Sequence, residues 1–142
     1  MVWMIQLMNL HEKGDLFNYT DSCFYRCGKP AGKSLVIHET FLLNGRERLS
    51  DRDYKYFNYV QSYQNFPYPA SEGLNIYSFA LYPDKFQPSG TCNMSQIETI
   101  RIAMRLSSCI NEYNPAKFRG YALVYNVLRI MNGISGLVFN KV

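Results

Sequence analysis

Six prolines, at positions 30, 67, 69, 83, 88 and 115, divide this 142-residue chain into short segments. Proline has no amide hydrogen to donate, so it interrupts helices and the interior of strand ladders. A bundle of long helices is therefore excluded. Aromatic residues make up 15% of the chain, and they accompany many β-branched residues; both types favour strands. The sequence predicts an all-β fold of short strands joined by turns.

The chain has the length and the composition of one folded unit. Hydrophobic residues make up 47% and charged residues 18%, which excludes the polar, highly charged composition of disordered chains. No internal repeat and no change of composition marks a linker. We expect residues 1–142 to form a single domain with its own core.

Apolar runs mark the expected strands. Residues 100–106 alternate between apolar and polar side chains, as in a strand with one solvated face. In residues 121–131, odd and even positions are both apolar apart from Asn126 and Arg129. This pattern predicts a strand covered on both faces. Asn126 and Arg129 would then need polar partners. The strands are predicted at residues 2–7, 35–43, 75–81, 97–106, 121–131 and 136–139.

The region after the second expected strand contains a turn signal and a helix signal. Asn44-Gly45 is a typical hairpin-turn dipeptide. Ser50 or Asp51 could cap one short helix near residues 51–61, within which Tyr54, Phe57 and Gln61 have helical spacing.

Residues that could carry chemistry do not form a recognisable site. The segment 28–34 resembles a phosphate-binding loop, but only three residues separate its glycines and one of them is proline. Cys23 and Cys27 lack a second close ligand pair for zinc. With two histidines in the chain, no nucleophile and base pair is evident. We expect no catalytic, cofactor or metal site, and no enzymatic activity.

The charge and the targeting features of the sequence argue against nucleic-acid-binding, secreted and membrane-spanning proteins. The net charge is +4 without a dense basic stripe, so nucleic-acid binding is not expected. The apolar N-terminus lacks the basic region and cleavage site of a secretory signal, and no apolar run reaches the length of a membrane span. We expect an unexported chain with free thiols, in which the sequons at Asn18 and Asn93 are structural or fortuitous.

Three stretches, residues 41–61, 75–95 and 125–137, carry a more specific likeness. Their sequences, including Gln-Pro-Ser-Gly-Thr-Cys-Asn-Met-Ser at 87–95, resemble the C-terminal part of the major capsid proteins of nucleocytoplasmic large DNA viruses. Residues 2–6 and 17–20 also resemble segments of that family. The matching residues include Arg52, Asp53, Phe57, Gln61, Gln87, Pro88, Ser89, Gly90, Thr91, Asn93, Ser95, Asn126 and Arg129.

The resemblance implies a jelly-roll β-sandwich that is incomplete, because the likeness covers only the later part of the second jelly roll of a double jelly-roll protein. It implies a structural role in an icosahedral virion, after synthesis in the host cytoplasm. The implied partners are other capsid protein chains, through a homotrimer or through complementation by the missing N-terminal portion. The alternative is a jelly-roll carbohydrate-binding module of the lectin type, because one fold serves both uses. A cupin-type enzyme ranks third, since its clustered histidines are missing.

Overall fold

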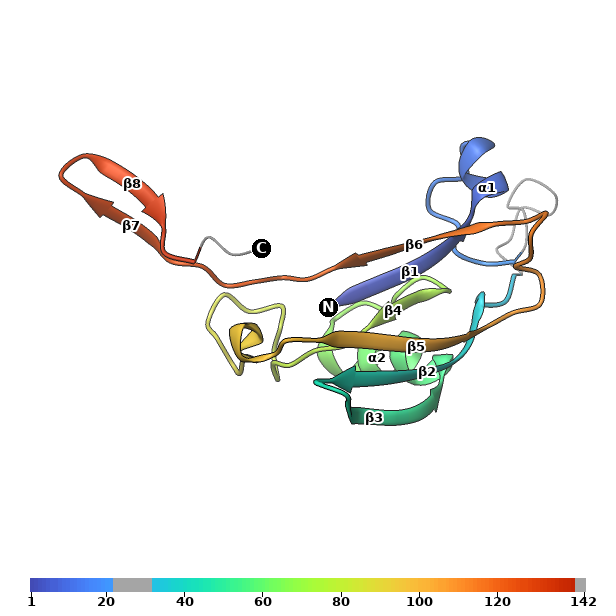
Figure 1. Cartoon of the computed structure of the whole chain (residues 1–142), viewed down its shortest axis with the longest axis horizontal. Helices are drawn as coiled ribbons and strands as arrows, with labels where there is room; N and C mark the ends of the chain where they lie inside the picture. Colours follow the sequence, from blue (N-terminus) through green and yellow to red (C-terminus); the bar gives the residue numbers. More distant parts are fainter. Residues whose placement is uncertain (22–31, 140–142) are drawn as a thin grey trace.

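A computed structural model describes residues 1–21 and 32–139, which form two facing three-stranded sheets and a separate hairpin (Figure 1). The first sheet has the order β4-β1-β6 and the second has the order β3-β2-β5, and every strand pair is antiparallel. The strands are β1 (Val2–Leu7), β2 (Val36–Leu43), β3 (Arg46–Asp53), β4 (Leu74–Ile76), β5 (Ile100–Leu106), β6 (Ala116–Tyr121), β7 (Leu128–Met131) and β8 (Ile134–Leu137). The all-β prediction is confirmed.

Strand β1 is the centre of the first sheet. Its apolar sequence suits a position between two partners, and residues 3–7 are all buried. It pairs with β6 along its whole length, from Val2 opposite Tyr121 to Leu7 opposite Ala116. A short helix, α1 (Met8–Glu12), follows directly.

The hairpin of β2 and β3 is closed by the predicted Asn44–Gly45 turn. Both residues have positive φ, 50° and 75°, the conformation that makes Asn-Gly favourable in two-residue hairpin loops. The Asn44 side chain also accepts hydrogen bonds from the backbone N–H groups of Glu98 (2.9 Å) and Thr99 (3.1 Å). The turn therefore also fixes the chain that leads into β5.

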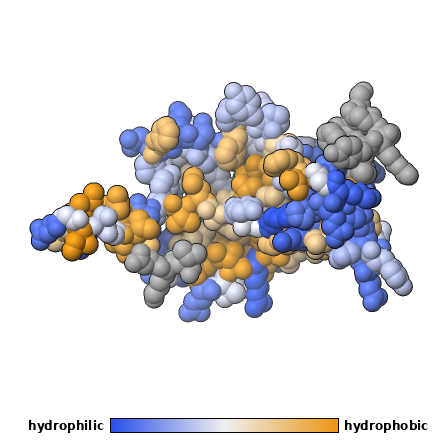
Figure 2. Space-filling view, turned by 90° about the horizontal axis from the view of Figure 1, so that it is seen from above, coloured by the Kyte–Doolittle hydropathy of each residue, from blue (hydrophilic) through white to orange (hydrophobic). Residues whose placement is uncertain are grey.

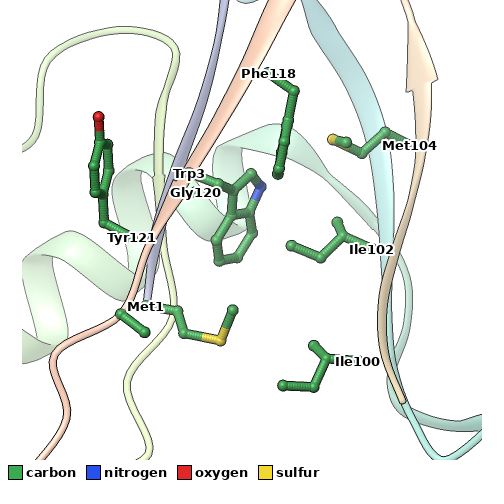
Figure 3. A pocket seen from close by; sticks show the side chains of 9 residues that line it. Met1, Trp3, Ile100, Ile102, Met104, Phe118, Gly120 and Tyr121 are labelled. Carbon is green, nitrogen blue, oxygen red and sulfur yellow. The ribbon is translucent and has the colours of Figure 1, made fainter. Parts of the chain in front are cut away.

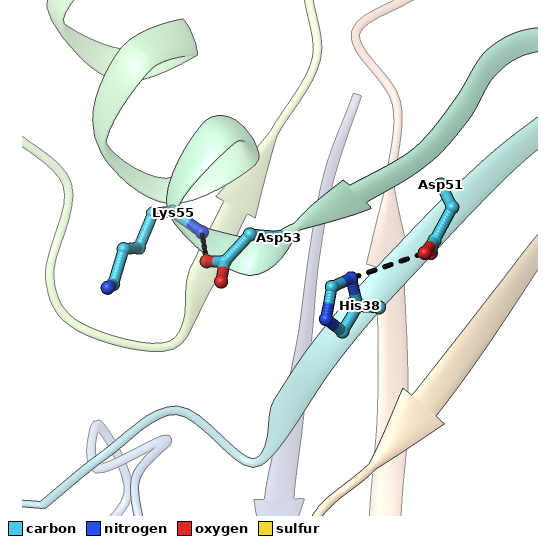
Figure 4. A network of polar contacts seen from close by, with 4 residues as sticks. All are labelled: His38, Asp51, Asp53 and Lys55. Carbon is cyan, nitrogen blue, oxygen red and sulfur yellow. Dashed lines mark hydrogen bonds and ion pairs between the residues drawn. The ribbon is translucent and has the colours of Figure 1, made fainter.

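The predicted start of the helix, at Ser50 or Asp51, was wrong. Ser50 and Asp51 lie in β3, because the Asn44–Gly45 turn sends the chain back along β2 in a ladder that continues to Asp53. The helical segment comprises a π-helical turn, η2 (Tyr56–Val60), and α2 (Gln61–Asn65). At its beginning, Asp53 Oδ1 accepts a hydrogen bond of 3.0 Å from the Lys55 backbone N–H (Figure 4).

The expectation of one covered strand over residues 121–131 was also wrong. The ladder of β6 with β1 ends at Tyr121, and residues 122–127 have no regular structure before β7 begins at Leu128. The side chains of Leu123 and Ile130 are 80% and 68% exposed. In Figure 1, the β7–β8 hairpin projects away from the two sheets. Contacts among the described residues therefore do not bury the apolar side chains of this segment.

Two other predicted strands are shorter than expected. Of residues 75–81, only the first two belong to β4, which spans Leu74–Ile76, and Tyr77 is buried outside any strand. The segment 97–106 forms β5 from Ile100 onward, after a 3-10 turn, η3 (Met94–Gln96).

An aromatic cluster joins the sheets and the helical segment. The rings of Trp3 and Phe57 meet edge to face with centroids 5.4 Å apart, and Trp3 stacks on Phe41 at 6.4 Å. Phe41 in turn contacts Tyr77 at 5.3 Å. These four side chains are buried, so the core draws one residue each from β1, β2, η2 and the segment after β4. A second cluster packs beside it: Ile5, Leu7, Leu10, Leu35 and Val36.

Candidate assembly surface

An apolar cleft opens on one side of the molecule, between the edges of the two sheets. Strand β6 is the edge of the first sheet and β5 the edge of the second, and residues of both strands line the same cavity of about 440 Å³ (Figure 3). The lining residues are Met1, Trp3, Ile100, Ile102, Met104, Phe118, Gly120, Tyr121 and Ala122.

The cleft combines exposed apolar side chains with unpaired strand edges. Figure 3 shows Phe118 and Ile102 directed toward the space above the Trp3 ring. The side chains of Phe118 and Ile100 are 48% and 41% exposed, whereas Trp3 is only 1% exposed. Among the described strands, β5 pairs only with β2 and β6 only with β1, so one edge of each has backbone groups that another chain could bind. No lining side chain carries a charge. The cleft suits an extended polypeptide with apolar side chains.

A buried carboxyl group lies directly below this cleft. The Trp3 indole N–H donates a hydrogen bond of 2.6 Å to Glu39 Oε2. Glu39 is only 1% exposed, and its Oε1 has no hydrogen-bond partner within the part of the chain that the structure describes. Burial raises the pKa of Glu39 to about 7, against the smaller opposing effect of the Trp3 hydrogen bond. This contact was not predicted, although Glu39, the one acidic residue in the largely apolar run 35–43, is a signal for it.

Four of the residues singled out from the sequence lie around the start of the helical segment. Asp53 accepts a hydrogen bond from the Lys55 N–H just before it, and the Arg52 guanidinium lies over the Tyr56 ring, 5.5 Å from its centroid. Phe57 is fully buried against Trp3. Gln61 donates from Nε2 to the Tyr56 hydroxyl at 3.0 Å. Their contacts are structural and do not converge on a cavity.

The segment 87–95 forms a loop without strands, as expected. The Ser89 hydroxyl accepts a hydrogen bond of 2.8 Å from the Tyr82 backbone N–H, which closes the loop on itself. Asn93 Oδ1 accepts from Ser95 N (3.1 Å) and Ser95 Oγ (2.5 Å), so this sequon forms a local turn. Gly90 has a φ of 138°, and an added Cβ would lie 3.2 Å from the Phe79 carbonyl oxygen. The remaining members of the set, Gln87, Pro88 and Thr91, are exposed.

The last two residues of the set lie on the projecting hairpin. Asn126 closes its base, donating from Nδ2 to the Phe139 carbonyl oxygen at 2.8 Å and accepting from the Phe139 N–H at 3.2 Å. Arg129 lies opposite Gly136 on β7 and is exposed, without an ion pair to any described residue. The polar partner expected for Arg129 is therefore not among the described residues, and its pairing stays a prediction. The strongly hydrophobic surface of the projecting end is visible in Figure 2.

Polar and thiol groups do not assemble a metal site within residues 1–21 and 32–139, where no group of three or more His, Cys, Asp and Glu side chains could hold an ion. His38 Nδ1 lies 3.3 Å from Asp51 Oδ2 in an exposed pair (Figure 4). Cys92 and Cys109 are free thiols. Cys23, Cys27 and most of the glycine-rich segment 28–34 lie outside the described residues. None of the described helices is long and apolar enough to span a membrane.

Comparison with known proteins gives one consistent result. A family model described as large eukaryotic DNA virus major capsid protein matches residues 1–136. The major capsid protein of Phaeocystis pouchetii virus is 46% identical over 111 residues, covering 78% of this chain and 21% of the relative. The probable capsid protein 4 of Acanthamoeba polyphaga mimivirus is 38% identical over 143 residues, covering 98% of this chain and 28% of the relative.

The fold also matches a solved structure. PBCV-1 VP54, fitted into a reconstruction of the virophage Sputnik, superposes with a TM-score of 0.70 at 24% identity, covering 99% of this chain and 42% of that chain. A quasi-atomic model of the PBCV-1 virus capsid gives a TM-score of 0.71 with the same coverage. The chain thus spans less than a third of the two curated relatives and less than half of the solved one.

Proposed function

Because this chain belongs to the family of large eukaryotic DNA virus major capsid proteins, we propose that it is a structural component of a virion, acting as one wall-building domain in a trimeric capsomer. It is made in the host cytoplasm and carries no catalytic activity. Its partners are other capsid protein chains, and nucleic acid is not among them.

The open side formed by β5 and β6 is the observation that carries this proposal. An enzyme or a lectin needs convergent polar groups in a concave site, whereas this cleft is lined by apolar side chains and bordered by two free strand edges. Exposed edges and contiguous apolar surface are features of a protein that binds other chains. The PBCV-1 capsid structure provides the comparison for such an assembly.

Sedimentation and electron microscopy of the purified chain test the proposal. We expect the isolated chain to be oligomeric or poorly soluble. Co-expression with the remainder of a family member should give soluble trimers with the dimensions of a capsomer. A monodisperse monomer that melts cooperatively and never enters a trimer would contradict the proposal. Binding to a defined sugar on a glycan array without assembly would favour a lectin.

A further inference from the structure

We propose that the β5–β6 side accepts two separate strands from another polypeptide segment, one adding to each sheet. This inference rests on the proposed function for the identity of the donor. Jelly rolls are built from eight strands in two sheets, and within residues 1–21 and 32–139 each of the two facing sheets has three strands. Both sheets end on the same side, at the strands that line the cleft. One additional strand per sheet would restore two four-stranded sheets.

The geometry requires two strands that are not paired with each other. Hydrogen-bonded neighbours in a sheet lie about 4.8 Å apart, whereas facing sheets lie about 10 Å apart. A tight hairpin could therefore extend only one sheet. A donor that completes both sheets must place one strand beside Ala116–Tyr121 and the other beside Ile100–Leu106.

The lining of the cleft defines the chemistry of the donor strands. On β6, Phe118 and Gly120 face the cleft, and on β5 the residues facing it are Ile100, Ile102 and Met104. A donor strand should therefore present apolar side chains at every second residue and polar ones between them. Gly120 lies opposite Trp3 in the β1–β6 ladder, and the Phe118 ring is 3.4 Å from the position that a Cβ would occupy there, so a donor side chain at this point would pack against the Phe118 ring.

Family relatives provide the source of the donor. The chain covers 21% of the Phaeocystis pouchetii virus major capsid protein and 42% of the solved PBCV-1 protein, so most of each relative lies outside the matched region. The β7–β8 hairpin of a second copy is a poorer fit. Its strands have four residues each and already pair with one another, so it could complete only one of the two sheets.

Hydrogen–deuterium exchange on a reconstituted complex tests the inference. The probe is the part of the Phaeocystis pouchetii virus major capsid protein outside the matched 111 residues, co-expressed with this chain. Complex formation should slow amide exchange in both β5 and β6. The opposite sheet edges, β3 and β4, are the internal controls and should exchange as in the isolated chain.

Adjacent substitutions on β5 provide the matched variants. Ile102→Glu places a carboxylate in the cleft, whereas Arg101→Glu introduces the same residue on the exposed face. Because an unpaired buried charge is strongly unfavourable, Ile102→Glu should weaken the complex at least about tenfold and Arg101→Glu should have little effect. Phe118→Glu, at a more exposed lining residue, replaces Ile102→Glu if the latter does not fold by circular dichroism.

The outcomes separate this inference from the proposed function. Protection of β5 and β6 together supports it, whether or not trimers form. Absence of a complex, or a complex that protects neither strand or only one, overturns it even if capsomers assemble. Protection of residues 128–137 and of one sheet edge in the isolated chain, increasing with its concentration, would identify a second copy as the occupant and would also overturn it.

Discussion

The Trp3 indole and the Glu39 carboxylate are joined by a 2.6 Å hydrogen bond that connects β1 of one sheet to β2 of the other. Each residue is only 1% exposed. Because the second carboxylate oxygen has no partner among the described residues, charge on Glu39 is disfavoured in the folded protein. The contact between the sheets is therefore sensitive to pH.

Stability should decrease as pH rises from about 4.5 to about 7 on account of Glu39. The pKa of Glu39 is about 7 in the folded protein, against 4.5 for an unperturbed glutamate, so folding favours the protonated carboxyl. The stability that this preference provides is complete below pH 4.5 and is lost as the pH rises to about 7. Glu39→Gln keeps an acceptor for Trp3 without the charge. At pH 8 it should be more stable than the parent by up to about 3 kcal/mol, with a small difference at pH 4, measured by urea unfolding.

The same change at an exposed residue is the control for this prediction. Glu47 on β3 is exposed, so Glu47→Gln should leave the pH dependence of unfolding unchanged. Equal pH profiles for Glu39→Gln and the parent would show that the buried carboxyl does not set this dependence.

Truncation of Phe57 should strongly destabilise the protein. Its ring is 0% exposed and contacts Trp3 and Tyr56 edge to face, with centroids at 5.4 and 5.2 Å. Phe57→Ala should lower the free energy of unfolding by about 3 to 5 kcal/mol, the usual range for a buried phenylalanine. Tyr63→Ala, at an 88% exposed position six residues later, should cost less than about 0.5 kcal/mol. Similar denaturation midpoints for the two variants would refute the assignment of the core.

Removal of the Asn126 side chain should loosen the projecting hairpin without unfolding the sheets. Asn126 makes two hydrogen bonds to Phe139 and accepts one from the Val127 N–H at 2.8 Å. Asn126→Ala should accelerate amide exchange in β7 and β8 about tenfold, the equivalent of one or two net hydrogen bonds, and leave β1 unchanged. Ser135→Ala, on β8 itself, is the control. Unchanged exchange in β7 would mean that the turn alone holds the hairpin.

Arg129 should matter for assembly and not for the stability of the isolated chain. Its side chain is exposed on β7, so Arg129→Met should change the free energy of unfolding by less than about 0.5 kcal/mol. If the residue contacts another subunit, the same variant should reduce trimer yield on co-expression. Normal stability combined with normal trimer yield would identify it as an ordinary surface residue.

The sequence predicted the features that depend on local pattern. The apolar run at 2–7, the alternation in Ile100–Leu106 and the Asn44–Gly45 turn each specify a conformation through neighbouring residues, and each is present in the structure. The Asn132–Gly133 turn between β7 and β8, with φ values of 50° and 77°, carries the same signal and could have been predicted.

Features that depend on distant partners could not be predicted in this way. Residues 46–53 are mostly charged or polar, and they become a strand because β2 provides a ladder beside them. The ladder of β6 with β1 ends at the pair Tyr121 and Val2, and the apolar residues beyond Tyr121 leave the first sheet. The cleft could not be predicted because the sequence does not show which strands lie at the edges of the sheets. The motif residues were located from a family likeness, and their contacts became clear only from the structure.

The pairing of β1 with β6 also affects the order of events during synthesis. Val2 lies opposite Tyr121 and Leu7 opposite Ala116, so β1 obtains its longest partner only after more than a hundred further residues have been synthesised. Contacts between residues so distant in sequence form slowly. Until then, the three residues of β4 are the sheet partner of the apolar segment 2–7 among the described residues, and exposed segments of this kind associate with other nascent chains. Chaperone binding to β1 during translation is the expected cellular consequence of this topology.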